Sequence, residues 1–321
     1  HGQRSTIGSA VHLARQSGAS PAWSLLAIVG LIANTAILTF YGVVAGWVIY
    51  FVGTSAADLA GAIGAGDPLR GAYAEQSVAQ IQEMMPTLFA NPVLLVGLQL
   101  AFVVLTVWIV ARGVKGGIEM AATWLMPAFF FLLIGITVYA AIIGQAFFSL
   151  SLGGGAMIAY GAYASRDTNL AQTSGMIAFA DTGVAIIAGL AIFPIVFFVG
   201  MEPNAGPTLM FQTLPAAFNA MPGGAIVGLA FFVLALFAAL TSSVSLLEIS
   251  VGWVIEKFGV GRAKAAIGIG VLVFLVGLLS ALSFNVLADQ RPIPFIPGFE
   301  NATWFDAIDG VTGKLLLPLS G

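Results

Sequence analysis

The chain has 321 residues, of which 59% are hydrophobic and only 8% charged, and its mean hydropathy is +1.01. Soluble domains carry roughly 25% charged residues, so this composition excludes an ordinary water-soluble protein and predicts an all-α membrane protein with one transmembrane domain, residues 1–321. The formal net charge of −3 gives no strongly basic surface, so we expect no nucleic-acid partner, and the absence of cysteine excludes disulfides and cysteine-based metal sites.

Apolar stretches long enough to cross a bilayer recur along the chain. A hydrocarbon core of roughly 30 Å needs about 20 residues in a helix. On this basis we predict seven complete spans and the start of an eighth, at residues 21–52, 92–110, 120–140, 143–164, 168–200, 222–255, 265–288 and 309–321. Residues 201–221 are apolar but interrupted by Pro203, Pro207 and Pro215, so we predict a capping hairpin on the outer face.

The charges between the spans predict the orientation. If residues 1–20 are cytoplasmic, eight Lys and Arg residues fall on the cytoplasmic side and two, Arg70 and Arg291, on the outer side. This bias is typical of a multi-pass protein of the cell membrane. The eight cytoplasmic cations are Arg4, Arg15, Arg112, Lys115, Arg166, Lys257, Arg262 and Lys264.

The first candidate site is the segment Ser149–Gly155, which ends in three glycines inside an apolar stretch. Each glycine costs about 1 kcal/mol against alanine in a helix, and a broken helix in lipid leaves backbone groups without partners unless it faces protein or a cavity. Exposed N–H groups there can hold a carboxylate, and freed carbonyls can hold Na⁺. Close helix packing through small residues is the alternative.

Two further candidates could partner a cation. Asp181 lies within an apolar span, where an ionised Asp costs roughly 2.5–3.5 kcal/mol, and a bound cation would offset that cost. The run Thr241–Ser243 follows Ala238 and offers oxygen ligands on one helix. The alternatives are a protonated or hydrogen-bonded Asp181 and hydroxyl groups that bond their own helix or a neighbouring helix.

Tyr41 lies in an uncharged span, so its hydroxyl needs a partner, which is either a ligand carboxylate or a neighbouring helix. Glu248 and Glu256 follow on the Thr241 helix, and Glu256 next to Lys257 has a solvated ion pair as its default interpretation. No hydrolase elbow, P-loop or zinc signature is present, so we predict that the protein is not an enzyme.

Together, Gln145–Ala156 (QAFFSLSLGGGA) and Leu240–Ser243 (LTSS) resemble the neurotransmitter:sodium symporter family, which includes bacterial sodium-dependent amino-acid transporters. The resemblance covers essentially the whole chain and also includes Asp181-Thr-Gly-Val-Ala and Thr213-Leu-Pro215. It implies the leucine-transporter-like (LeuT-like) inverted-repeat fold. We interpret the chain as a fragment from about helix 3 to the start of helix 10, truncated at both ends and therefore not expected to transport by itself.

The resemblance implies roles for individual residues. Ser149 and Asp181 would form the first sodium site, with Asp181 in place of the Asn of many relatives, and Ala238, Thr241 and Ser242 would contribute to the second. The substrate contacts would be Tyr41, Ile37, Phe148, Ser149, Ser151, Gly153, Gly154, Ser242 and Leu246. Asp309 would be the outer gate acid, and Glu256 and Tyr163 would belong to the cytoplasmic gate.

The implied function is sodium-coupled amino-acid symport by alternating access, with Na⁺ as the co-transported ion, no organic cofactor, and an amino acid and the lipid bilayer as partners. Gly154 stands where the leucine transporter has a bulky aromatic residue, which predicts a large hydrophobic or aromatic substrate. The negative charge of Asp181 predicts independence from chloride. A proton-coupled transporter of related fold and a non-transporting receptor or channel remain alternatives. The sequence does not determine the oligomeric state, and a homodimer is one candidate.

Overall fold

A computed structural model of the chain describes residues 5–18, 20–113 and 209–320, together with scattered residues between 117 and 186. Every regular element in these ranges is helical, which confirms the predicted all-α class. The elements are α1 (Thr6–Gln16), the turn η1 (Pro21–Trp23), α2 (Ser24–Gly64), α3 (Val78–Gln82), α4 (Met84–Phe89), α5 (Pro92–Ala111), the π-helical turn η4 (Leu209–Thr213), α9 (Leu214–Asn219), α10 (Gly224–Phe258), α11 (Arg262–Leu282), α12 (Trp304–Val311), the π-helical turn η5 (Thr312–Leu316) and α13 (Leu317–Ser320).

In the part of the chain that the structure describes, four helices are long and apolar enough to cross a membrane, namely α2, α5, α10 and α11. A helix bonds its own backbone groups, which is what a bilayer requires of a spanning segment. α2 continues to Gly64, past the predicted end at residue 52, and α11 ends at Leu282. The segments predicted as spans at 120–140, 143–164 and 168–200 fall mostly outside the described residues.

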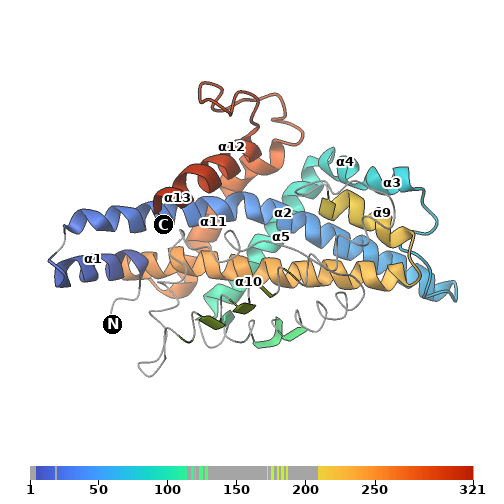
Figure 1. The fold of residues 1–321 in the computed structure, drawn as a ribbon, viewed down its shortest axis with the longest axis horizontal. Helices are drawn as coiled ribbons and strands as arrows, with labels where there is room; N and C mark the ends of the chain where they lie inside the picture. Colours follow the sequence, from blue (N-terminus) through green and yellow to red (C-terminus); the bar gives the residue numbers. More distant parts are fainter. Residues whose placement is uncertain are drawn as a thin grey trace.

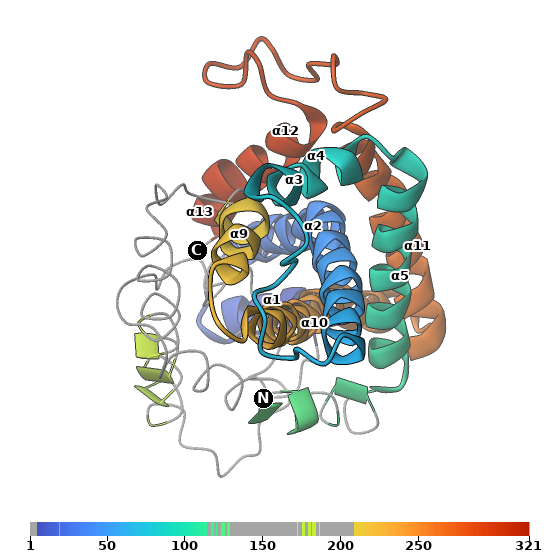
Figure 2. The same cartoon turned by 90° about the vertical axis from the view of Figure 1, so that its right-hand side faces the viewer.

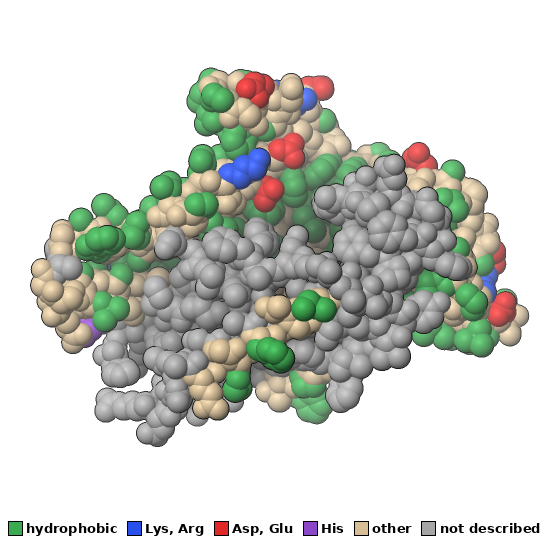
Figure 3. Space-filling model, in the orientation of Figure 1, with side chains coloured by type: hydrophobic (Ala, Val, Ile, Leu, Met, Phe, Trp, Pro, Cys, Tyr) green, Lys and Arg blue, Asp and Glu red, His purple; other side chains and the backbone are tan. Residues whose placement is uncertain are grey.

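The long helices form a bundle around α2 and α10, which lie together and run in opposite directions along the long axis (Figure 1). α5 and α11 lie side by side on one flank (Figure 2). α1 lies at one end of the bundle, and α3, α4 and α9 lie towards the other. In Figure 3, much of the charge on the visible described surface lies at the end that holds α3 and on the segment that projects before α12.

The end of α2 near α3 is fastened to the following loop by polar contacts. Arg70 pairs with Asp58 at 2.9 Å, and the second Asp58 oxygen accepts a hydrogen bond from the Tyr73 backbone N–H at 2.9 Å. The Tyr73 hydroxyl lies 2.9 Å from that of Ser55 and 3.1 Å from that of Thr54. Burial raises the pKa of Tyr73 although both hydrogen bonds lower it, so the phenol is neutral and holds the loop as a hydrogen-bonding group.

Trp47 organises an aromatic cluster deeper in the bundle. Its side chain is fully buried on α2 and contacts rings from several elements, with centroid separations from 5.0 to 6.0 Å. Its ring partners are Phe89 of α4, Phe211 of η4, Phe284 just after α11 and Phe305 of α12. Such edge and offset contacts stabilise beyond area burial alone, so Trp47 ties the short elements to α2.

Two glycines set how closely the long helices approach. A Cβ at Gly46 of α2 would lie 3.0 Å from the Gln99 backbone nitrogen of α5. A Cβ at Gly277 of α11 would lie 2.6 Å from the Thr39 carbonyl oxygen of α2 and would collide with the Gln99 side-chain amide. Small residues at such crossings let helix backbones meet in membranes, so α2, α5 and α11 are in near-backbone contact here.

We therefore expect Gly277→Ala to lower stability by about 1–3 kcal/mol, since the added methyl group meets the Thr39 backbone carbonyl as well as the buried Gln99 side chain. The matched control is Gly268→Ala on the same helix, where the Cβ would meet nothing within 4 Å. That change should be neutral or slightly stabilising because alanine is the better helix former. The measurement is thermal unfolding in detergent, and equal midpoints for the two variants would contradict the close crossing.

Candidate functional site

One face of α10 bears a strip of hydroxyl groups in an otherwise apolar helix. Ala238, Thr241, Ser242 and Ser245 follow at three- and four-residue spacing and so share this face. Ser242 is exposed and the other three are half-buried, whereas Leu240 and Ser243 beside them are buried. The strip is therefore the least covered polar part of the middle of α10.

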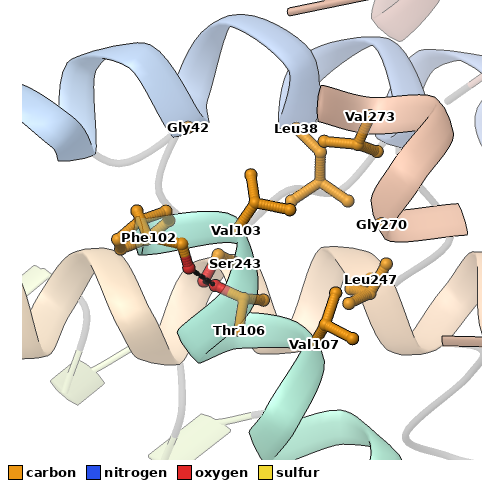
Figure 4. A pocket seen from close by; sticks show the side chains of 10 residues that line it. All are labelled: Leu38, Gly42, Phe102, Val103, Thr106, Val107, Ser243, Leu247, Gly270 and Val273. Carbon is orange, nitrogen blue, oxygen red and sulfur yellow. Dashed lines mark hydrogen bonds between the residues drawn. The ribbon is translucent and has the colours of Figure 1, made fainter. Parts of the chain in front are cut away.

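The opposite side of α10 is packed against α5. The Ser243 hydroxyl lies 2.9 Å from that of Thr106, and both are buried (Figure 4). The cavity around this pair is only about 10 Å³ and has mainly apolar walls, which is near the lower limit for a single water molecule. The sequence run Thr241–Ser243 is thus divided: Ser243 joins two helices, and Thr241 and Ser242 face elsewhere.

Two pairs of oxygen atoms in the strip already lie together. The Thr241 hydroxyl donates to the Ala238 carbonyl at 3.0 Å, and the Ser245 hydroxyl donates to the Thr241 carbonyl at 2.9 Å. Both acceptor and hydroxyl oxygens retain lone pairs, so a hard cation could contact the Ala238 carbonyl and the Thr241 hydroxyl at once. Among the described residues no cluster of three or more acidic or histidine side chains is found, and neutral oxygens of this kind suit a weakly held monovalent ion.

Tyr41 of α2 faces this strip, because its side chain lies close enough to Ser242 for the two hydroxyl groups to interact. Tyr41 also packs against a buried apolar cluster that contains Ile37 and Leu246. The structure thus brings together five of the sequence-predicted residues, which are Ile37, Tyr41, Thr241, Ser242 and Leu246, with Ala238 one turn before Thr241. It places Ile37 and Leu246 within the packed interior beside Tyr41.

The same face of α10 is covered further along by α1. Ile249 is buried against Leu31 of α2, with Ile7 of α1 and Trp253 packed on them. Two turns after Ile249, Glu256 accepts a hydrogen bond from the Ser5 backbone N–H at 2.8 Å, at the N-terminus of α1. An acidic group is favourable at that position because of the helix dipole. Glu256 therefore fastens α1 over the end of the face that begins with Ala238.

The remaining predicted residues divide in two. Asp309 is exposed on α12, whose start is fixed by a reciprocal pair of hydrogen bonds between Thr303 and Asp306. The other predicted residues lie outside the described residues. They are Phe148, Ser149, Ser151, Gly153 and Gly154 of the glycine-rich segment, Asp181 of the first sodium site and Tyr163 of the cytoplasmic gate.

Glu248 has a partner that the sequence did not identify. Its carboxylate is 2% exposed and receives two hydrogen bonds from the Arg262 guanidinium at the start of α11, at 2.6 and 2.9 Å. This bidentate geometry is the strongest form of an Arg–carboxylate pair. The two residues are 14 positions apart and lie on different helices, so helical periodicity does not predict that they pair. The sequence does show an acid inside an apolar span and an Arg at the start of the next helix.

Breaking this pair should be costly, because Arg262→Leu leaves the Glu248 carboxylate buried without its guanidinium. We expect a loss of about 3–5 kcal/mol for the single change. The double change Glu248→Leu with Arg262→Leu removes both charges and should recover most of that loss. Thermal unfolding of the three proteins tests this, and a double variant no more stable than Arg262→Leu would contradict it.

The fold and sequence match known transporters. The crystal structure of MhsT in complex with L-phenylalanine superposes with a TM-score of 0.80 and 34% identity, covering 99% of this chain and 73% of MhsT. The uncharacterized sodium-dependent transporter YhdH of Bacillus subtilis is 33% identical over 97% of this chain and 70% of its own length. A second such transporter, from Haemophilus influenzae, is 31% identical over 96% of this chain and 70% of its own length.

These similarities define a sodium-dependent transporter with the LeuT-like fold, which confirms the predicted fold class. Residues 89–285 match the sodium:neurotransmitter symporter family, and the chain belongs to that family. It is accordingly a multi-pass membrane protein for which Na⁺ is the coupled ion, and its relatives are transporters rather than enzymes. The chain spans about 70% of the length of these relatives.

Proposed function

We propose that the protein imports a large hydrophobic or aromatic amino acid together with Na⁺ by alternating access. The observation that supports this most is the hydroxyl strip of α10 facing Tyr41, because polar oxygens gathered on a partly exposed face of an apolar helix suit a small polar solute and its ion. The similarity to MhsT, which was crystallised with L-phenylalanine, supports the substrate class.

In this proposal Na⁺ has two positions. Ala238, Thr241 and Ser242 contribute the described part of one, and Ser149 with Asp181 contributes to the other. A sodium ion next to Asp181 and the substrate carboxylate offsets negative charge in a low-dielectric interior, where Coulomb energies are larger than in water. Binding of the amino acid and of Na⁺ is therefore mutually favourable, which is the basis of coupling.

The substrate would lie beside Tyr41, and the Tyr41 hydroxyl would exchange its interaction with Ser242 for one with the amino-acid carboxylate. Phe148, Ser151, Gly153 and Gly154 complete the proposed pocket, with apolar support from the cluster of Ile37 and Leu246. A glycine at 154 leaves volume for a large side chain. Uniform hydrophobic pockets discriminate by only 1–3 kcal/mol per methylene group, so a range of large substrates is expected.

Alternating access requires the two ends of the pathway to open in turn. With residues 1–20 on the cytoplasmic side, α1 covers the inner end of the α10 face through Glu256 and the cluster around Ile249. Release of substrate to the cytoplasm then requires these contacts to separate, with Tyr163 as a further member of the inner gate. Asp309 would serve the outer gate.

Removing one strip hydroxyl should weaken sodium binding without removing the substrate pocket. We expect Thr241→Val, which keeps the side-chain shape, to raise the Na⁺ concentration for half-maximal L-tryptophan binding by about tenfold, since a lost ligand oxygen costs 1–3 kcal/mol. The matched control is Thr106→Val, which removes a buried hydroxyl of α5 that faces the packed side of α10. The measurement is equilibrium binding to the full-length protein, and an equal shift in both variants would contradict the sodium role.

The substrate class can be tested by competition. Tryptophan, phenylalanine and leucine should displace a bound radiolabelled amino acid from the full-length protein at lower concentrations than glycine or alanine. Gly154→Phe should reverse this preference by filling the pocket. If glycine and alanine compete best against the unchanged protein, the large-substrate proposal is wrong. Uptake driven by a pH gradient in sodium-free buffer would instead indicate proton coupling.

A further inference from the structure

The flank of the bundle has an apolar groove between α5 and α11, with a volume of about 380 Å³. Its rims are large, partly exposed side chains, Leu100, Val104 and Trp108 from α5 and Ile267, Val271 and Phe274 from α11. Val104 is 57% exposed and Ile267 is 54% exposed. The groove is therefore an open slot in the surface and is distinct from the interior cavity around Ser243.

The floor of the groove lies where the two helices touch. A Cβ at Gly270 of α11 would collide with the Val107 side chain of α5. The glycine thus brings the helix axes together while the larger residues on either side stand out as walls. Lipid molecules that cover a flat helix face exchange rapidly with the bulk bilayer, whereas a narrow slot with walls can retain one acyl chain.

The groove has the length of one leaflet. On α5 it extends from Leu100 to Ala111, which is roughly 16 Å at 1.5 Å per residue. A hydrocarbon core is roughly 30 Å thick, so the slot covers about half of it. It ends at the last turn of α5 and near the first turn of α11, the end that the proposed orientation places at the cytoplasmic surface.

Positive charge gathers at that same end. Arg112 follows α5 directly, and its guanidinium carbon lies 3.6 Å from the centre of the Trp108 ring, itself part of the groove wall. Lys264 is exposed in the first turn of α11. A Cβ at Gly113 would lie 3.7 Å from Arg262 Cδ, so the two helix ends are adjacent. In the described ranges the ion pairs involve Arg70 and Arg262, not Arg112 or Lys264.

We propose that this groove is a binding site for an anionic phospholipid, with one acyl chain in the slot and the phosphate held by Arg112 and Lys264. Trp108 lies at the depth where Trp side chains prefer the headgroup boundary, and it holds the Arg112 guanidinium by a cation–π contact at the mouth of the slot. Two basic residues at the end of a narrow apolar slot match the two chemical halves of such a lipid, its charged headgroup and its acyl chain.

The test is native mass spectrometry of the full-length protein in detergent, titrated with phosphatidylglycerol and with phosphatidylcholine of the same acyl chains. We expect phosphatidylglycerol to bind more tightly. Arg112→Gln and Lys264→Gln should each weaken its binding about fivefold and leave phosphatidylcholine little changed. Arg112→Lys should restore the preference. Arg291→Gln, which removes an exposed cation outside the helices, is the matched control and should change nothing.

A substitution that fills the slot tests the contribution of the acyl chain to binding separately from that of the headgroup. Val271→Trp adds bulk to an exposed wall residue and should weaken both lipids equally, with an unchanged unfolding midpoint as the sign of an intact fold. Equal binding of the two lipids to the unchanged protein would overturn the proposal. It would also be overturned if Val271→Trp abolished a dimer while lipid binding stayed the same, because the groove would then be an interface between two copies.

Discussion

Near-backbone contact at Gly46 and Gly277 determines how α2, α5 and α11 are arranged. Helices in a bilayer gain little from hiding apolar side chains from one another, because lipid is equally apolar. Close approach and packing must hold them together instead. The consequences extend beyond the crossing itself: Gln99 is buried between the three helices, the α5–α11 groove opens beside Gly270, and α10 meets this body along a tight seam at Ser243 and Thr106.

The two sides of α10 differ in their polar groups and in how tightly they are packed. Towards α5 it presents a buried hydroxyl pair and a cavity scarcely larger than one water molecule. Towards Tyr41 it presents the hydroxyl strip, and about two turns after Thr241 it holds the Glu248–Arg262 pair. A helix held firmly on one side can keep its other side loosely covered without unfolding. This division allows a proposed ion site to retain weak neutral ligands in a stable protein.

The fold class was predictable because few charges and regular apolar runs leave a helical bundle as the economical solution in a bilayer. The site was predictable in part: the spacing of Ala238, Thr241 and Ser242 places them on one face, but spacing alone could not tell that Ser243 serves α5. The contact between Tyr41 and Ser242 joins residues far apart in the chain, and local sequence patterns do not encode such pairing. The same limit concealed Arg262 as the partner of Glu248. The family resemblance supplied what periodicity could not, because it implied that Tyr41 and Ser242 both contact the substrate.

α2 has 41 residues, so it is roughly 60 Å long at 1.5 Å per residue, about twice the depth of a hydrocarbon core. It is a rigid rod that joins the α1 end of the bundle to the α3 and α9 end. Geometry then makes it a lever: rotation by about 10° around its centre displaces each tip by roughly 5 Å, in opposite directions. A small angular change between α2 and any neighbour is therefore amplified at both surfaces at once, where Glu256 fastens α1 and Asp58 fastens the opposite loop.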